Sequence, residues 1–288
     1  MISRFKPFSL NIRGRLLRYE RPAVMGIINA TPDSFFAPSR ALDSEAIAEK
    51  AAEMIAEGVD IIDVGAYSTR PGATAVSAGE ELERLRMAIV AVRSVDSVIP
   101  VSVDTFRADI ARLAVTEMGA DIINDISGGE FDSGMFDVAA ITHAPYILTH
   151  NPGTEGNMHP ACQYGDVVAD VLRWLSGRLR RLALAGVNDV IVDPGFGFGK
   201  TIEDNYRLMA SLPLFEALDR PLLVGISRKS MIYKQLGVDP TDAQDGTTAL
   251  NTVALLNGAS IIRVHDVKAA AQTVRLIQLI DSTTKADN

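Results

Sequence analysis

The chain has 288 residues and a net charge of −8, and 47% of its residues are hydrophobic, which excludes an intrinsically disordered protein. Acidic residues outnumber basic ones 36 to 28, which argues against nucleic-acid binding through a basic surface. No apolar run approaches the roughly 18–20 residues that cross a bilayer, and the single Cys162 allows no intrachain disulfide. We therefore expect a cytoplasmic protein that binds neither membrane nor nucleic acid.

Short apolar segments alternate with helical patterns along the chain. The predicted strands span 24–29, 60–65, 99–104, 121–126, 145–150, 190–195, 221–227 and 260–266. The predicted helices include 45–57, 79–93, 107–117, 166–184, 205–211, 247–257 and 267–281. Glycines at 58, 119, 186 and 258 end helices just before strands, so one helix-to-strand turn is used four times. The strands are apolar on both faces, as parallel strands covered by helices are.

Eight such units favour a single (β/α)8 TIM barrel with a parallel eight-stranded core. No proline- or serine-rich linker divides the chain, so residues 1–288 are predicted to form one domain, with residues 1–22 as an N-terminal extension. The alternative is an open doubly wound sheet, which requires a glycine fingerprint after its first strand. The segment that follows the first strand, from Ala30 to Phe36, contains no glycine.

Polar residues stand at the same end of all eight predicted strands, which is where barrels place their active sites. They include Asn29, Asp63, Asp104, Asn124, His150, Asp193, Lys229, Arg263 and His265. Stability alone does not require this pattern, because a buried charge is costly unless it is paired. For any single residue, His265 included, a structural ion pair or hydrogen bond remains an open alternative.

The residue types narrow the chemistry of this predicted site. Asp104, Asn124 and Asp193 suit a flat heterocycle that carries several donors and acceptors, and Lys229 adds a further donor. The planar guanidinium of Arg263 can stack on a ring. Together with Arg70 and His265, Arg263 can also form a pocket for phosphate or diphosphate.

Several other chemistries are disfavoured. Residues 195–201 look superficially like a phosphate-binding loop, but Pro194 stands where that motif requires glycine. There is no His-Glu-x-x-His motif for a tightly held transition metal and no Gly-x-Ser-x-Gly nucleophile elbow. A Schiff-base aldolase using Lys229 is conceivable, but nothing in the sequence marks this lysine as desolvated.

Seven collinear segments resemble the signatures of the dihydropteroate synthase family. They are 25–35, 61–65 with 68–72, 102–106, 123–126, 193–201, 225–230 and 263–267, and the resemblance extends from residue 24 to about residue 280. That family is a (β/α)8 barrel, which agrees with the fold expected from the strand pattern. Seven motifs in order are far more specific than any one of them.

The resemblance implies a transferase that condenses 4-aminobenzoate with (7,8-dihydropterin-6-yl)methyl diphosphate in folate biosynthesis. It implies Asp104, Lys229 and Arg263 as catalytic residues, with Asn124 and Asp193 helping to hold the pterin and Arg263 stacking on its ring. Asn29 would bind Mg²⁺ with the diphosphate, whose oxygens would contact Arg70, Arg263 and His265. Thr69, Pro71, Phe198 and Ser230 would line the aminobenzoate site, and Asp33 and Phe35 would close over it. The family is commonly homodimeric.

The sequence departs from the family pattern at three places. Residues 36–40 replace a glycine-containing loop, Ala66-Tyr67 replaces Gly-Glu, and Thr149 replaces a methionine before the histidine that ends the fifth strand. These changes leave loop stiffness and sensitivity to sulfonamides open. Two other readings also stay open: a barrel that transfers a methyl group from methyltetrahydrofolate to a corrinoid, and a non-catalytic paralogue that binds pterin or a partner.

Overall fold

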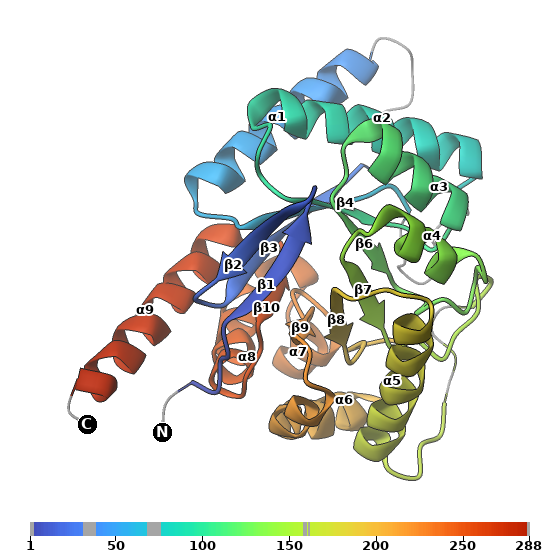
Figure 1. Ribbon diagram of the computed structural model, residues 1–288. Coiled ribbons are helices and arrows are strands. Elements are labelled where there is room, and N and C mark those ends of the chain that lie inside the picture. Colours follow the sequence, from blue (N-terminus) through green and yellow to red (C-terminus); the bar gives the residue numbers. More distant parts are fainter. Residues whose placement is uncertain (1–2, 31–38, 68–75, 158–159, 161, 287–288) are drawn as a thin grey trace.

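A computed structural model describes residues 3–30, 39–67, 76–157, 160 and 162–286. Within these residues it contains eight parallel strands in one sheet, at the centre of a ring of helices (Figure 1). They are β3 (Ala23–Asn29), β4 (Ile61–Gly65), β5 (Val101–Asp104), β6 (Ile122–Asp125), β7 (Tyr146–Thr149), β8 (Val190–Asp193), β9 (Leu223–Val224) and β10 (Ile261–Val264).

The sheet closes into a barrel. Its hydrogen-bonded order is β8-β7-β6-β5-β4-β3-β10-β9, and a parallel bridge from Val192 to Leu222 joins β8 to the segment that leads into β9. The predicted (β/α)8 barrel is therefore confirmed, and each predicted strand overlaps one of the eight observed strands. The strands are buried along almost their whole length, which is why they appear as unbroken apolar runs in the sequence.

The helices that cover the barrel alternate with these strands. They are α1 (Ser39–Ala56), α2 (Ala78–Val95), α3 (Ala108–Leu113), α4 (Met135–Thr142), α5 (Val167–Leu184), α6 (Ile202–Ala210), α7 (Ser230–Leu236), α8 (Gln244–Leu256) and α9 (Val267–Ala286). A π-helical turn (Ala114–Met118) extends α3, and two 3₁₀ segments (Leu212–Leu218 and Pro240–Asp242) follow α6 and α7. Within the described residues, no helix combines the length and apolarity needed to span a membrane.

The repeated helix-to-strand turn is confirmed in its backbone geometry. Its four glycines, at positions 58, 119, 186 and 258, all have positive φ angles, between 86° and 101°. Glycine is favoured there because a side chain in this left-handed region is strained. Two short helices, α4 and α7, escaped prediction because fewer than three turns give little periodicity to detect.

The N-terminal extension, for which the sequence predicted no element, forms an antiparallel hairpin of β1 (Phe8–Ile12) and β2 (Arg15–Tyr19). Arg13 and Gly14 connect the strands with φ angles of 52° and 76°, as a type I′ turn requires. The hairpin closes the end of the barrel where the strands begin. Its buried side chains join residues from most of the barrel strands in one apolar cluster: Leu10, Ile12 and Tyr19 cluster with Ala23, Met25, Ile61, Ile122, Ile147, Ile191, Leu223 and Ile261.

A buried carboxylate anchors the hairpin to the barrel. Asp121, whose side chain is fully buried, accepts hydrogen bonds from Arg13, from Arg93 at 2.5 Å and from the backbone N–H of Val101 at 2.8 Å. The backbone N–H of Asn11 also donates to Asp189 at 2.7 Å. Polar contacts therefore fix the hairpin in place while its apolar face fills the end of the barrel, leaving the opposite end to carry chemistry.

Candidate active site at the carboxyl ends of the strands

Polar side chains from neighbouring strands meet at the carboxyl end of the barrel. Asp104 ends β5 and is in register with Asn124 of β6, while Gly65 of β4 lies opposite Asp104 on the other side. A Cβ atom added to Gly65 would lie 3.4 Å from the Cβ of Asp104, an ordinary contact distance, so β4 and β5 lie close together at the site. Parallel pairing thus brings together residues that are far apart in the sequence, as the strand-end pattern predicted.

Arg263 joins two carboxylates at this end. Its Nε donates to Asp63 Oδ2 at 2.7 Å, and its Nη2 donates to Asp104 Oδ2 at 2.8 Å. Asn124 Nδ2 also donates to Asp63 Oδ2, at 3.1 Å. The Asp63 side chain is fully buried, whereas 16% of the Asp104 side chain and 21% of the Arg263 side chain remain exposed. The cluster is therefore held from beneath by Asp63 and faces outward through Asp104 and Arg263.

Asp63 is a site residue to which the sequence analysis gave no specific role. Its Oδ1 is buried and has no hydrogen-bond partner among the described residues. Leaving a buried acceptor unpaired costs about 1–3 kcal/mol, so such atoms commonly meet a ligand or a water molecule. The available signal was a carboxylate between Ile62 and Val64, inside an otherwise apolar strand.

Burial also shifts the proton affinities of the site. Desolvation raises the pKa of Asp104 to about 7, although the positive charge of Arg263 lowers it. The negative charge of the nearby Asp63 adds to the rise. Desolvation likewise raises the pKa of Asp193, against the charge of Lys229. Desolvation lowers the pKa of Lys229 to about 8, although Asp193 favours its charged form. Titration near neutral pH is typical of functional carboxylates and amines.

Lys229 lies beside the loop that follows β8. Its Nζ donates to the carbonyl of Phe196 at 2.6 Å and lies 4.9 Å from the ring centroid of Phe198. Asp193 Oδ1 accepts the N–H of Gly195 at 2.8 Å, which ties the strand end to the same loop. The Phe198 ring packs with Phe106 and Ile126 in a small apolar cluster. A cation, a carboxylate and an apolar wall are therefore adjacent.

The loops after β9 and β10 are linked to each other. Ser227 Oγ lies 3.0 Å from His265 Nδ1 and accepts the His265 N–H at 3.2 Å. Arg228, with a φ angle of 56°, forms two hydrogen bonds with Asp266, at 2.6 and 3.1 Å. Ser230, the next predicted site residue, begins α7.

The structure brings together part of the set expected from the sequence. Asp104, Asn124 and Arg263 are in one contact network, and Asp193, Lys229 and Phe198 surround the adjoining loop. Asn29 ends β3 with its side chain exposed. Asp33, Phe35, Thr69, Arg70 and Pro71 lie outside the described residues. Within the described part of the chain, no three His, Cys, Asp or Glu side chains are grouped to hold a metal ion.

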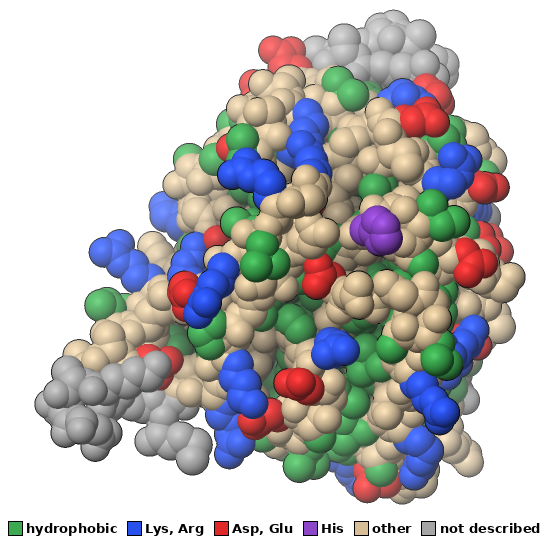
Figure 2. Space-filling model, in the orientation of Figure 1, with side chains coloured by type: hydrophobic (Ala, Val, Ile, Leu, Met, Phe, Trp, Pro, Cys, Tyr) green, Lys and Arg blue, Asp and Glu red, His purple; other side chains and the backbone are tan. Residues whose placement is uncertain are grey.

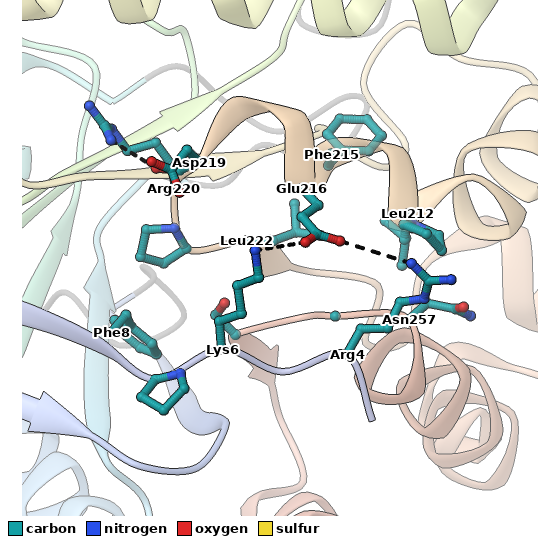
Figure 3. A pocket seen from close by; sticks show the side chains of 15 residues that line it. Arg4, Lys6, Phe8, Leu212, Phe215, Glu216, Asp219, Arg220, Leu222 and Asn257 are labelled. Carbon is teal, nitrogen blue, oxygen red and sulfur yellow. Dashed lines mark hydrogen bonds and ion pairs between the residues drawn. The ribbon is translucent and has the colours of Figure 1, made fainter. Parts of the chain in front are cut away.

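A separate pocket, with a cavity volume of about 200 Å³, lies at the opposite end of the barrel (Figure 3). Its charged groups already neutralise one another, because Lys6 Nζ lies 2.6 Å from Glu216 and Arg4 lies 3.9 Å from the same carboxylate. Figure 2 shows Lys and Arg interspersed with Asp and Glu on the face it presents, with no continuous basic patch. The carboxyl end of the barrel is therefore the better candidate for chemistry.

Comparison with known proteins identifies the family to which the chain belongs. The family described as "Pterin binding enzyme" matches residues 25–265. The dihydropteroate synthase of Synechocystis is 43% identical over 260 residues, which is 89% of each chain. A structure of Xanthomonas albilineans dihydropteroate synthase with 4-aminobenzoic acid is 39% identical, with a TM-score of 0.87, and covers 95% of this chain and 98% of that one. The same enzyme with 7,8-dihydropteroate gives 36% identity, a TM-score of 0.84 and coverages of 95% and 99%.

Proposed function

The chain belongs to the pterin-binding enzyme family, among the dihydropteroate synthases, and we propose that it makes 7,8-dihydropteroate from 4-aminobenzoate and (7,8-dihydropterin-6-yl)methyl diphosphate. This activity is that of a transferase, and its product is a precursor of folate. The observation that carries the proposal at atomic level is the Asp63–Arg263–Asp104 cluster with Asn124, placed at the carboxyl end of a pterin-family barrel.

The proposed pterin site uses buried groups that recognise a flat ring with several N–H groups. Hydrogen-bond acceptors come from the carboxylates of Asp104 and Asp193, and the Asn124 amide adds a donor and an acceptor. Lys229 supplies a further donor, and the planar guanidinium of Arg263 can stack on the ring. The unpartnered Oδ1 of Asp63 adds an acceptor below this set. Such a site rejects analogues that leave its buried polar atoms unpaired.

The proposed reaction separates bond breaking from bond making. The C–O bond to the diphosphate breaks first and its electron pair leaves with the diphosphate, so the pterin methylene becomes cationic. The carboxylate of Asp104 stabilises that charge in a site with little water. The arylamine nitrogen then forms the C–N bond with this methylene and releases a proton to water, and it needs positioning more than activation. Phe198, Ser230, Thr69 and Pro71 are proposed to position it, with Asp33 and Phe35 excluding water.

The proposed diphosphate site combines Arg70, Arg263 and His265. Asn29 is proposed to ligate Mg²⁺, because an exposed amide oxygen at a strand end suits an ion that takes few protein oxygens together with phosphates and waters. When bound, Mg²⁺ would neutralise charge on the departing diphosphate. The protein's own cations perform the rest of that task, since Arg263 can exchange a carboxylate partner for a phosphate oxygen.

The proposed activity is tested by measuring diphosphate release from the pterin diphosphate with and without 4-aminobenzoate, at millimolar Mg²⁺. We expect one dihydropteroate for each diphosphate, and release that depends on the arylamine. Pterin binding by calorimetry without turnover would instead identify a non-catalytic pterin-binding protein. Methyl transfer from methyltetrahydrofolate to a corrinoid would instead identify a pterin-binding methyltransferase.

We also propose that the chain is a homodimer that pairs through α8 and α9. Leu276, Leu279 and Ile280 form a stripe on α9 that is more than half exposed, and Val253 and Leu256 on the neighbouring α8 are each 37% exposed. Contiguous exposed apolar side chains of this kind mark association surfaces. Sedimentation should give a dimer for the wild type and a monomer for Leu279→Glu. The control Leu184→Glu changes an 81% exposed leucine on α5 and should remain dimeric. A monomeric wild type would refute the proposal.

A further inference from the structure

Lys200 lies behind the proposed substrate site, and the proposed mechanism does not use it. Its Nζ donates to the carbonyl of Gly195 at 2.8 Å, to that of Phe198 at 3.1 Å and to that of His150 at 3.4 Å. It also lies 2.9 Å from His150 Nδ1. Burial lowers the pKa of His150, so its imidazole is neutral and can accept this hydrogen bond. One ammonium group therefore joins the loop after β8 to the end of β7.

The loop that Lys200 holds, residues 195–200, carries groups of the proposed site. Lys229 holds the same loop from the substrate side through the carbonyl of Phe196, and the ring of Phe198 faces its ammonium group. Asn205 Oδ1 accepts the N–H of Gly197 at 2.7 Å, which fixes the middle of the loop to α6. The path of this loop therefore decides where the Phe198 ring lies.

The loop is pressed tightly against the segment that follows β7. Gly195 has a φ angle of 69°, and a Cβ atom there would lie 1.9 Å from the carbonyl oxygen of His150. This close approach is possible only for glycine. It places carbonyl oxygens of both segments near each other, where a shared donor offsets their mutual repulsion; the Gly195 carbonyl also accepts the Phe198 N–H at 3.2 Å.

Burial lowers the pKa of Lys200 to about 7, although the neighbouring Asp193 favours its charged form. The charge of Lys229 also lowers this pKa, while Asp204 raises it. The carbonyl ligands point at the ammonium, so its N–H groups are used within the loop. This direction distinguishes Lys200 from the lysine of a phosphate-binding loop, which extends toward its ligand.

We propose that Lys200 is a positioning residue for the arylamine: by drawing the loop 195–200 onto His150, it sets the Phe198 ring against the proposed aminobenzoate site. The inference rests on the proposed function. Asp193 is less dependent on Lys200 because its backbone carbonyl is already held by the His150 N–H at 3.0 Å, as part of the sheet. Loss of Lys200 should therefore affect the arylamine more than the pterin.

The test compares Lys200→Met and Lys200→Gln with the matched control Lys234→Met, which changes an exposed lysine on α7. We expect Lys200→Met to raise KM for 4-aminobenzoate about tenfold or more, as loss of a charge-assisted hydrogen bond would. The dissociation constant of the pterin diphosphate should change less than twofold. Lys200→Gln keeps N–H donors and should recover part of the loss, and the control should match the wild type.

Fluorescence of Trp174 provides a readout that does not depend on turnover. This residue is the only tryptophan of the chain, and its ring packs edge-on against His150 with 5.0 Å between ring centroids. Its emission should change in Lys200→Met and not in Lys234→Met. If the wild type shows no synthase activity, the proposed function fails while this comparison still tests the loop. Unchanged emission in Lys200→Met would assign Lys200 a structural role only. The same conclusion would follow if this variant had a lower Tm but an unchanged ratio of the affinities for the two substrates.

Discussion

Replacing Asp104 with asparagine is expected to lower kcat by at least about 10²–10³-fold, the range seen when a preorganised electrostatic group is removed from an active site. The variant keeps the size of the side chain and removes the negative charge that faces the pterin methylene. Arg263 retains Asp63 as a partner, so the barrel should fold. Single-turnover measurement of dihydropteroate formation gives the rate, and Asp109→Asn, an exposed carboxylate on α3, is the control.

The pH dependence gives the same prediction a second, independent measurement. Because burial raises the pKa of Asp104 to about 7, kcat/KM of the wild type should fall as the pH drops below 7 and Asp104 becomes protonated. Asp104 also holds its proton more tightly in the folded chain than in the unfolded chain between about pH 4 and 7, so its ionisation lowers stability as pH rises through that window.

The Asp104→Asn variant should escape that loss of stability. The free energy of unfolding of the variant minus that of the wild type should therefore be larger at pH 8 than at pH 5. An inactive variant that is also unfolded at both pH values would show instead that Asp104 is needed for the fold. A variant with normal turnover would remove Asp104 from the mechanism.

Arg263→Ala is expected to weaken pterin and diphosphate binding together, because one guanidinium is proposed to serve both. It should also destabilise the fold by about 3–5 kcal/mol, since two carboxylates that share a site would lose their counter-charge. Calorimetry with the pterin alone and with diphosphate alone measures the two affinities separately, and urea unfolding measures the stability.

A double variant separates folding from binding. In Arg263→Ala/Asp63→Asn the buried charge is removed along with its partner, so stability should recover while both affinities remain low. Arg180→Ala, an exposed arginine on α5, serves as the control. Loss of only one of the two affinities would show that Arg263 does not have both roles.

The strands could be predicted because each is buried on both faces, and polar residues lie in or just after their carboxyl ends. The same reasoning placed Asp104, Asn124 and Arg263 at one end of the barrel, since parallel strands share a direction. It could not reveal that Arg263 pairs with Asp63, because the two are 200 residues apart and nothing local couples them. The role of Lys200 was equally hidden, because only the folded loop turns three carbonyls toward its ammonium group.

The hairpin was missed for a different physical reason. Four of the five residues of β2 are exposed, so Arg15–Tyr19 lacks the apolar run that reveals a buried strand. Its partner β1 contributes the side chains that matter for packing, but five residues give only three inward positions, Phe8, Leu10 and Ile12. Their role depends on a barrel end that exists only once all the strands are assembled.

That dependence has a consequence for biosynthesis. Chains leave the ribosome from the amino end, so the hairpin emerges before any barrel strand, whereas its packing partner Ile261 follows about 240 residues later. At about 5–20 residues per second, roughly 12–50 s separate the two. During this interval Leu10, Ile12 and Tyr19 have no complete surface on which to pack. A segment made before every barrel strand is therefore among the last to reach its final environment, and a nascent chain interrupted before Ile261 carries an apolar hairpin for chaperones to recognise.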